Sequence, residues 1–275
     1  MSLSVRVAEK FRDKRQASID LDGLARLARA HGYAALCLRA SQVGVHSPPG
    51  AAAEAAATLG EHGLAASMLT GDFAIPENSD DEGPRALRGI APYLDLAETL
   101  GADLLRVCIK TQEDIEWTRR AADEAAERGL RLAHQCHTRS LFEKVDESLD
   151  ALGAVGRPNF GLIYEPANLE LCGEDYGPDA VRRLAPHIFN VYLQNQRLDP
   201  AGDDSLDTWC RGTVRFDHVP VWEGGGIDFA PLLDALDGVG YDGYVTIHQA
   251  FAGLKGPQEA AEHSARYLKA TGHFS

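Results

Sequence analysis

Apolar and polar residues alternate along this chain with two periods, and glycines mark the points where the period changes. Apolar residues at helical spacing over 21–31 end at Gly32, and the short apolar run 35–39 follows as a candidate strand. The same order of helix, glycine and apolar run recurs to the end of the chain. The candidate strands are 4–7, 35–39, 64–69, 103–109, 132–137, 160–164, 188–193 and 243–247, and the candidate helices are 21–31, 51–62, 84–100, 111–128, 140–152, 179–185, one from 228 and one from 257.

Eight units of strand followed by helix predict a closed barrel. Strands that alternate with helices pair in parallel, and 275 residues is a usual length for one (β/α)8 TIM barrel. We therefore expect a single TIM barrel domain over 1–275, with an open doubly wound sheet as the alternative. No Gly-x-Gly-x-x-Gly motif follows the first candidate strand, so we expect no nucleotide cofactor.

Two tetrapeptides resemble capping boxes, in which a serine or threonine and an acid three residues later satisfy the first backbone N–H groups of a helix. Thr111 with Asp114 predicts the start of one helix, and Ser140 with Glu143 predicts the start of the next.

The segment 194–227 shows no periodic element, so we predict a long loop after the strand 188–193. It carries Trp209, His218, Trp222 and a run of three glycines that begins at Gly224. Loops of this length are usually lids or binding loops, and in a barrel the loop after a strand lies on the catalytic face.

Charge and composition limit the classes of binding partner that are expected for this protein. The formal net charge is −14, from 27 Lys and Arg against 41 Asp and Glu, and no basic run offsets it, so we expect no nucleic-acid partner. No apolar stretch is long enough to cross a bilayer, and residues 1–9 carry charges where a signal peptide is apolar. For this reason a membrane partner is not expected. The five cysteines include no Cys-x-x-Cys pair, so a reducing cytoplasm is the expected compartment.

Polar side chains gather at the carboxyl ends of the candidate strands, where TIM barrels carry their active sites. Side chains alternate in direction along a strand, so the polar positions that share one face can be picked out. The predicted mouth of the barrel is lined by Gln135, His137, Glu165, Tyr192, Gln194 and His248, with Arg39 and Arg106 at equivalent positions of two earlier strands.

Four phrases carry a resemblance to a known family. Gly161-Leu-Ile-Tyr-Glu-Pro-Ala-Asn168 is similar to Gly-Leu-x-x-Asp-Pro-x-Asn, and 190–197 is similar to His-x-His-x-Lys-Asp-x-Arg. The stretch 222–229 resembles Gly-Glu-Gly-x-Val-Asp-Phe, and 240–247 resembles a Gly-Tyr-x-Gly approach to the last strand. Together they resemble the xylose isomerase-like barrel superfamily of sugar isomerases, epimerases and related dehydratases.

The resemblance implies a divalent ion held by a glutamate, an aspartate, a histidine and a second glutamate on the last four strands. At the matching positions this chain has Gln135, Glu165, Tyr192 and His248. In many family members the two glutamates also move the substrate proton, and an amide such as Gln135 cannot serve as a general base. The usual mechanism therefore does not transfer directly.

Two interpretations of the mouth stay open. Glu165, His248 and His137, with the Gln135 oxygen, could hold a divalent metal (Zn, Mn, Ni or Mg), and nitrogen-rich ligation favours zinc or nickel over magnesium. The alternative is a hydrogen-bonded polar lumen without metal. In that case His248 is the candidate base, because an unperturbed pKa of about 6.5 suits proton transfer near neutrality. Glu165 would orient it, and Tyr192 would donate to an oxyanion or simply pack.

Charged and aromatic residues around the mouth indicate the substrate class. Arg39 and Arg106 suit a carboxylate or phosphate, or else form salt bridges with acids at neighbouring strand ends. Arg197 matches an arginine that often contacts substrate oxygens in the family that the chain resembles. Trp222 stacks on a sugar ring or pins the loop. The expected substrate-binding set is completed by Gln135, Asn168 and Gln194.

We therefore predict a sugar or sugar-acid isomerase or epimerase, which removes a proton α to a carbonyl and stabilises the enediolate that forms. The alternatives are a related dehydratase or lyase, and a catalytically altered barrel that binds a sugar-like ligand. The superfamily's DNA-repair branch uses a histidine-rich multi-metal site and a basic surface, which this sequence lacks. The resemblance also implies a small carbohydrate or sugar acid as ligand and a homo-oligomer, as relatives often form dimers or tetramers.

Overall fold

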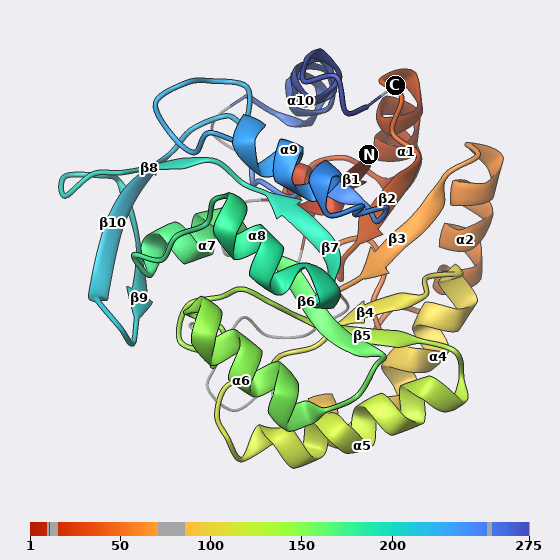
Figure 1. The fold of residues 1–275 in the computed structure, drawn as a ribbon. Helices are drawn as coiled ribbons and strands as arrows, with labels where there is room; N and C mark the ends of the chain where they lie inside the picture. The colour runs from red at the N-terminus through yellow and green to blue at the C-terminus, as the bar shows by residue number, and fades with distance from the viewer. Residues whose placement is uncertain (10, 12–15, 71–85, 252–254, 275) are drawn as a thin grey trace.

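A closed barrel of eight parallel strands forms the centre of the protein. The computed structural model describes residues 1–9, 11, 16–70, 86–251 and 255–274. The strands are β1 Ser2–Ser4, β2 Ala35–Leu38, β3 Ala65–Leu69, β4 Leu104–Arg106, β5 Arg131–Gln135, β6 Phe160–Tyr164, β7 Ile188–Leu193 and β11 Val245–Ile247. They close in the order β1-β11-β7-β6-β5-β4-β3-β2 with helices around them (Figure 1), so the predicted TIM barrel is confirmed.

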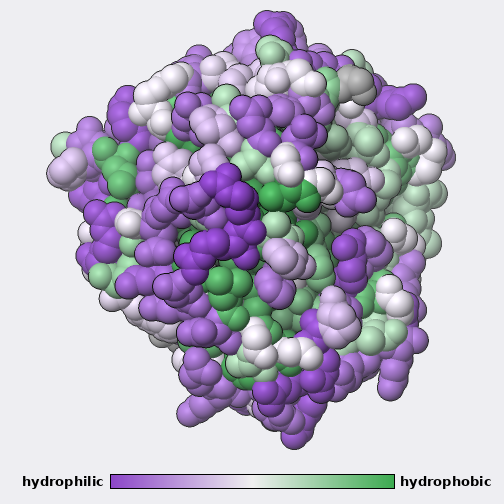
Figure 2. Space-filling model, in the orientation of Figure 1, coloured by the Kyte–Doolittle hydropathy of each residue, from purple (hydrophilic) through white to green (hydrophobic). Residues whose placement is uncertain are grey.

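Helices cover the outside of the barrel and turn their apolar sides toward it. They are α1 Leu21–Ala30, α2 Ala51–Glu61, α4 Ala91–Leu100, α5 Asp114–Glu127, α6 Val145–Val155, α7 Pro166–Leu171, α8 Pro178–Leu184, α9 Ala230–Gly238 and α10 Pro257–Ala270. In α1, for example, Leu24, Ala25 and Ala28 are buried on one face. Figure 2 shows hydrophilic side chains over most of one face of the molecule and hydrophobic ones grouped near its centre. None of the described helices is both long and apolar enough to span a membrane.

The interior of the barrel is a packed core. One buried side chain from each of six strands fills it: Cys37, Met68, Leu104, Ala133, Ile163 and Tyr192. Neighbouring positions on the strands, such as Leu36, Leu132 and Leu162, belong instead to the larger core between barrel and helices. Because the interior is filled, the ends of the strands are where the barrel would bind a ligand.

The first strand lies earlier in the chain than predicted. The sequence indicated 4–7, but β1 is Ser2–Ser4, and Val5–Ala8 forms a 3-10 helix, η1. Ser4 caps this turn, since its Oγ accepts a hydrogen bond from the Arg6 N–H at 3.2 Å. Arg6 is therefore a residue of the turn at the strand end and not of the strand.

Helix α5 begins at Asp114, three residues after the predicted start at Thr111. The Asp114 carboxylate accepts hydrogen bonds from the N–H groups of Lys110 and Thr111 at 2.9 and 2.8 Å. These bonds resemble those made by the acidic residue of a capping box. They stabilise the turn before the helix, however, and the helix itself does not begin until Asp114.

Helix α6 begins at Val145 and not at the predicted capping box of Ser140 and Glu143. The Ser140 Oγ accepts a hydrogen bond from the Phe142 N–H, and the Glu143 carboxylate reaches a distant turn that is described below. The predicted start of another helix at 84 lies outside the described residues; the 3-10 turn η2 Ala86–Gly89 precedes α4 there.

The predicted loop 194–227 contains a three-stranded antiparallel sheet, which corrects the expectation of no regular element. The strands β8 Gln196–Leu198, β9 Asp204–Thr208 and β10 Gly212–His218 pair in the order β8-β10-β9. Leu206 and Phe216 pack with Leu171 of α7 as a separate small core. With so few apolar positions, the strands show too little alternation to be recognised. Figure 1 shows this sheet beside α7, at one side of the barrel.

Candidate active site

Polar side chains are buried in a ring at the carboxyl ends of the barrel strands. Each lies at or directly after the end of a strand and is less than one-tenth exposed. The ring consists of Arg6, Arg39, Thr70, Arg106, Gln135, His137, Glu165, Gln194 and His248. Buried polar groups are unfavourable unless they find partners, and this ring lies where the fold places binding sites.

Three guanidinium groups and two carboxylates act on one another in and beside this ring. Burial lowers the pKa of Arg6 to about 10, and the charges of Arg39 and Arg106 add to that shift. Glu165 and Glu9 act in the opposite direction. The five groups therefore form one electrostatic cluster in a water-poor site.

Arg39 forms a buried ion pair with Glu9, with 2.8 Å between its Nε and a carboxylate oxygen. Their side chains are 2% and 1% exposed. The salt bridge left open by the sequence is thus present for Arg39. The Arg39 Nη1 atom is also buried, and it has no hydrogen-bond partner in the part of the chain that the structure describes. A buried guanidinium N–H of this kind suits an anionic ligand.

His248 is neutral among these charges. Its pKa is lowered well below the usual histidine range, first by burial and then by Arg6, Arg39 and Arg106. Its Nδ1 forms a hydrogen bond with Ser4 Oγ at 2.9 Å, which leaves Nε2 as the ring nitrogen for a ligand. A bound anion would offset the arginine charges and raise the basicity of this imidazole.

Tyr192 belongs to the packed interior of the barrel and contacts His248 from there. Its ring stacks on the imidazole, and its hydroxyl lies 3.4 Å from Cys37 Sγ. Burial raises the pKa of Tyr192 well above its usual range, so the phenol stays protonated.

Side-chain amides hold the Glu165 carboxylate. Its Oε2 accepts hydrogen bonds from Gln135 Nε2 and from Asn168 Nδ2, the latter at 2.7 Å. Asn168 also donates to the Cys136 carbonyl at 2.8 Å, which fixes it to the end of β5. The buried Oε1 atoms of Gln135 and Gln194 accept no hydrogen bond from the described residues, so they suit hydroxyl groups of a ligand.

The predicted metal ligands at the mouth are not arranged as a metal site. Among the described residues, the one trio of His, Cys, Asp or Glu with ligand atoms within 4.8 Å of one another lies outside the ring. Glu165, His137 and His248 therefore do not converge as metal ligands do. His137 Nδ1 instead bonds to the Thr138 carbonyl at 3.1 Å. The three nearby guanidinium groups also oppose a further positive charge, so this donor set does not fit a divalent cation as it stands.

Arg197 and Trp222, two predicted substrate contacts, have protein partners. Arg197 lies on β8, half exposed, and its Nη2 is 3.0 Å from an Asp217 carboxylate oxygen. The Trp222 ring stacks on Phe251 with centroids 5.5 Å apart and meets His263 edge-on at 5.1 Å. The substrate roles of both residues stay predictions.

Arg6 and Glu9 were not among the site residues predicted from the sequence. Both follow β1, but the strand expected at 4–7 placed Arg6 inside a strand and left Glu9 in a connection. The signal that could have found them is a pair of opposite charges in an otherwise apolar segment, since buried charges are rare unless paired.

One protein family and several curated proteins are similar in sequence to this chain. A family profile described as xylose isomerase-like TIM barrel matches residues 25–271. An inosose dehydratase from Geobacillus thermodenitrificans (strain NG80-2) is 24% identical over 159 residues, which is 57% of this chain and 53% of that protein. An inosose dehydratase from Lacticaseibacillus casei is 28% identical over 169 residues, 58% of this chain and 55% of that protein. The chain spans about half the length of these curated relatives.

Solved structures of low sequence identity share the fold. The IolI protein with a bound zinc atom aligns with a TM-score of 0.73 at 17% identity, over 100% of this chain and 99% of that one. L-ribulose 3-epimerase aligns with a TM-score of 0.70 at 15% identity, over 98% of this chain and 93% of that one. At such identities the likeness shows the fold alone.

Proposed function

The chain belongs to the xylose isomerase-like TIM barrel family, and from that premise we propose that it is an enzyme acting on a sugar or sugar acid at the barrel mouth. The reaction begins with removal of a proton α to a carbonyl. Sugar isomerases and epimerases then return a proton to carbon, whereas dehydratases expel a β-hydroxyl. The observation that carries the proposal is the buried group of Arg6, Arg39 and Arg106 around a neutral His248.

The charges favour an anionic substrate. Arg6, Arg39 and Arg106 are positive and Glu9 and Glu165 are negative, so the described members of the cluster carry one uncompensated positive charge. A buried, unpaired charge is unfavourable, and one negative charge from a ligand would balance it. A carboxylate also matches the planar donor pair of a guanidinium group. We therefore favour a sugar acid over a neutral sugar.

His248 is the proposed base. A substrate carboxylate that offsets Arg39 and Arg106 raises the pKa of His248 toward the range in which it accepts a proton. The proton moves from the α-carbon to Nε2, and the C–H electron pair becomes the enediolate. The guanidinium groups stabilise the negative oxygen in a site with little water. The proton then returns to carbon in isomerisation, or leaves with the β-hydroxyl as water in dehydration.

The remaining ring residues position these groups. Tyr192 fixes the plane of the His248 imidazole by stacking. The Glu165 carboxylate, held by Gln135 and Asn168, orients the substrate by accepting hydrogen bonds from the substrate's hydroxyl groups. The Oε1 atom of Gln135 accepts a hydrogen bond from a further hydroxyl of the substrate.

Deuterium exchange tests the shared first step. The protein is incubated in D2O with ketoses, aldonates, uronates and cyclic polyol ketones, and loss of the α-proton is followed by NMR. We expect exchange of at least one anionic compound, abolished in His248→Ala and retained in Trp209→Ala, whose side chain is half exposed. Exchange that persists in both His248→Ala and Glu165→Gln would refute the assignment. Binding without exchange anywhere in the panel would support the catalytically altered barrel instead.

The products separate the two reaction types. An isomerase or epimerase yields a product of unchanged mass apart from deuterium, whereas a dehydratase yields one that is lighter by a molecule of water.

A metal-dependent form of the activity is the second candidate, favoured by the zinc atom in the similar IolI structure. It would use Glu165, His248 and His137 with the Gln135 oxygen as ligands, after a rearrangement that brings them together. Loss of exchange on treatment with a chelator, with recovery on adding zinc, would support it, provided that His248→Ala lowers the zinc content.

A further inference from the structure

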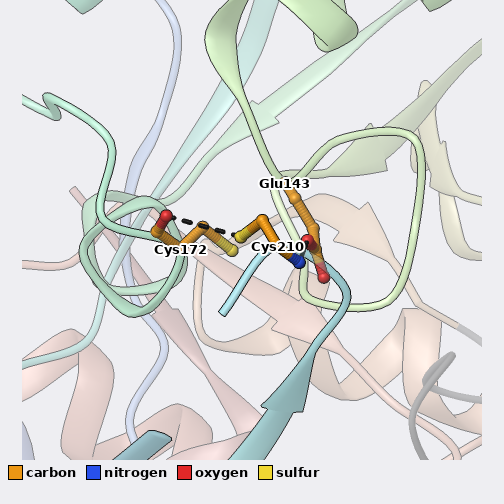
Figure 3. Close-up of side chains that lie close together, drawn as sticks. All are labelled: Glu143, Cys172 and Cys210. Carbon is orange, nitrogen blue, oxygen red and sulfur yellow. Dashed lines mark hydrogen bonds between the residues drawn. The ribbon is translucent and has the colours of Figure 1, made fainter. Parts of the chain in front are cut away.

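Three potential metal ligands converge outside the ring at the barrel mouth. They are Glu143 between β5 and α6, Cys172 directly after α7, and Cys210 in the β9–β10 turn. One ligand atom of each lies within 4.8 Å of the other two. Figure 3 shows the three side chains meeting from these separate segments. Only the folded chain brings this donor set together.

Glu143 is held rigidly within the group. It is 2% exposed, and its carboxylate accepts hydrogen bonds from the N–H groups of Arg139 at 2.6 Å, Trp209 at 2.7 Å and Cys210 at 2.9 Å. A carboxylate has about four acceptor positions, so one is left for a ligand. Hydrogen bonds from backbone N–H groups to a metal ligand fix its orientation and influence its affinity for the metal.

Without a cation, the two thiols of the group stay protonated. Burial raises the pKa of the Cys172 thiol, and the charges of Glu143 and Cys210 raise it further. Burial also raises the pKa of the Cys210 thiol, and a hydrogen bond with Glu143 and the charge of Glu143 add to that shift. A divalent cation would reverse this balance, because it stabilises thiolates and a carboxylate at once.

We propose that Glu143, Cys172 and Cys210 bind a divalent cation of the zinc class. Two thiolate sulfurs and one carboxylate oxygen supply three of the four ligands of tetrahedral zinc. Cys210 is exposed, so the fourth position is open to water. Binding replaces two S–H bonds by two metal–sulfur bonds and releases two protons to solvent, with no oxidation. Hard cations such as magnesium do not suit this sulfur-rich set.

The cation would fasten the small sheet to the barrel. Without it, the β9–β10 turn is held by the Glu143 carboxylate, by a weak hydrogen bond from Cys210 Sγ to the Cys172 carbonyl at 3.4 Å, and by Arg211, whose Nη1 donates to the Leu171 carbonyl at 3.2 Å. Helix α7 runs from Pro166, directly after Glu165, to the residue before Cys172. The same cation would thus stabilise the helix that carries Asn168, as a structural tie with no part in the reaction.

Cobalt titration tests this site without measuring activity. The full-length protein is reduced, stripped of metal with a chelator, and titrated with Co²⁺. We expect a thiolate-to-cobalt charge-transfer band in the near ultraviolet that saturates at one equivalent, and zinc should displace the cobalt. Cys172→Ser and Cys210→Ser each abolish the band, and Glu143→Gln weakens binding by more than about 10-fold.

Control variants separate this site from others. Cys108→Ser, which removes a buried thiol elsewhere, and His248→Ala, which alters the mouth, both keep the band. Circular dichroism of each variant shows whether it is folded. A folded protein that gives no band, or a band that survives in the Cys172→Ser, Cys210→Ser double variant, overturns the proposal. So does a mass 2 Da lower without reductant and no cobalt binding in the reduced form, which would indicate a redox pair instead.

Discussion

The His248 imidazole lies flat on the Tyr192 ring, with centroids 3.6 Å apart and an angle of 4° between the planes. The contact follows from the barrel register, in which Thr246 of β11 pairs with Tyr192 of β7 and His248 comes two residues later on the same face. A hydrogen bond between Nδ1 and Ser4 Oγ holds one edge of the imidazole. The candidate base is therefore fixed in orientation by the interior core beneath it.

Changing Tyr192 tests whether this stack positions the base. Tyr192→Phe keeps the ring and removes the contact with Cys37 Sγ, so we expect kcat to change by less than about 3-fold. Tyr192→Leu removes the stack, and a misplaced base lowers kcat by about 100-fold with little change in KM. The comparison is made by steady-state kinetics on the substrate found by deuterium exchange. Equal loss in both variants would instead point to the hydroxyl as the important group.

We expect two buried histidines to make the stability of the protein depend on pH. The pKa of His134 is lowered to about 3, and that of His248 is lowered well below its usual range, in both cases first by burial. Below about pH 6.5 the unfolded chain takes up protons that the folded chain does not, so stability is full at neutral pH and is lost as pH falls. Each histidine contributes at most about 1.4 kcal/mol per pH unit.

Urea unfolding between pH 7.5 and 4.5 measures this slope. His134→Gln is the matched variant, because it removes one of the two histidines, and its slope should be smaller than that of the parent protein by up to about 1.4 kcal/mol per pH unit. If the free energy of unfolding of the parent protein is constant over this pH range, His134 and His248 are not buried in their neutral forms.

The pair of Arg39 and Glu9 tests how the cluster is held. Arg39→Met leaves the buried Glu9 carboxylate without its cationic partner, so we expect a loss of about 3–5 kcal/mol in the free energy of unfolding. Replacing both residues with methionine should recover much of that loss, while binding of an anionic substrate stays impaired because the guanidinium group is gone. Urea unfolding and calorimetric titration measure the two effects. Arg197→Met, at an exposed pair, should change stability by less than about 1 kcal/mol.

Trp222 and Trp209 form a matched pair for the predicted sugar contact. Trp222 is packed on Phe251, which follows His248 by three residues, whereas Trp209 is 50% exposed. If Trp222 borders the substrate, binding of the substrate quenches tryptophan fluorescence. This quenching is lost in Trp222→Phe and kept in Trp209→Phe. Unchanged quenching in Trp222→Phe would assign the residue to packing alone.

The sequence by itself determined the barrel and located its mouth. Helical and strand periods repeat eight times, and parallel pairing of such units allows few closed arrangements. Alternation along the strands placed Gln135, Glu165 and His248 together at the strand ends, where the structure has them buried. These are properties of local spacing, which a sequence displays directly.

Only the tertiary structure decided which groups meet. Arg6 joins the ring because Ser4 caps a turn that ends β1 early, and Arg39 pairs with Glu9 across 30 residues of chain. Glu143 looked like the end of a capping box, yet its carboxylate holds the turn at Cys210, 67 residues away. Hydrogen bonds and ion pairs depend on distance in space, and contacts between distant segments leave no periodic trace in the sequence, so the charge balance of the site became visible only in the folded chain.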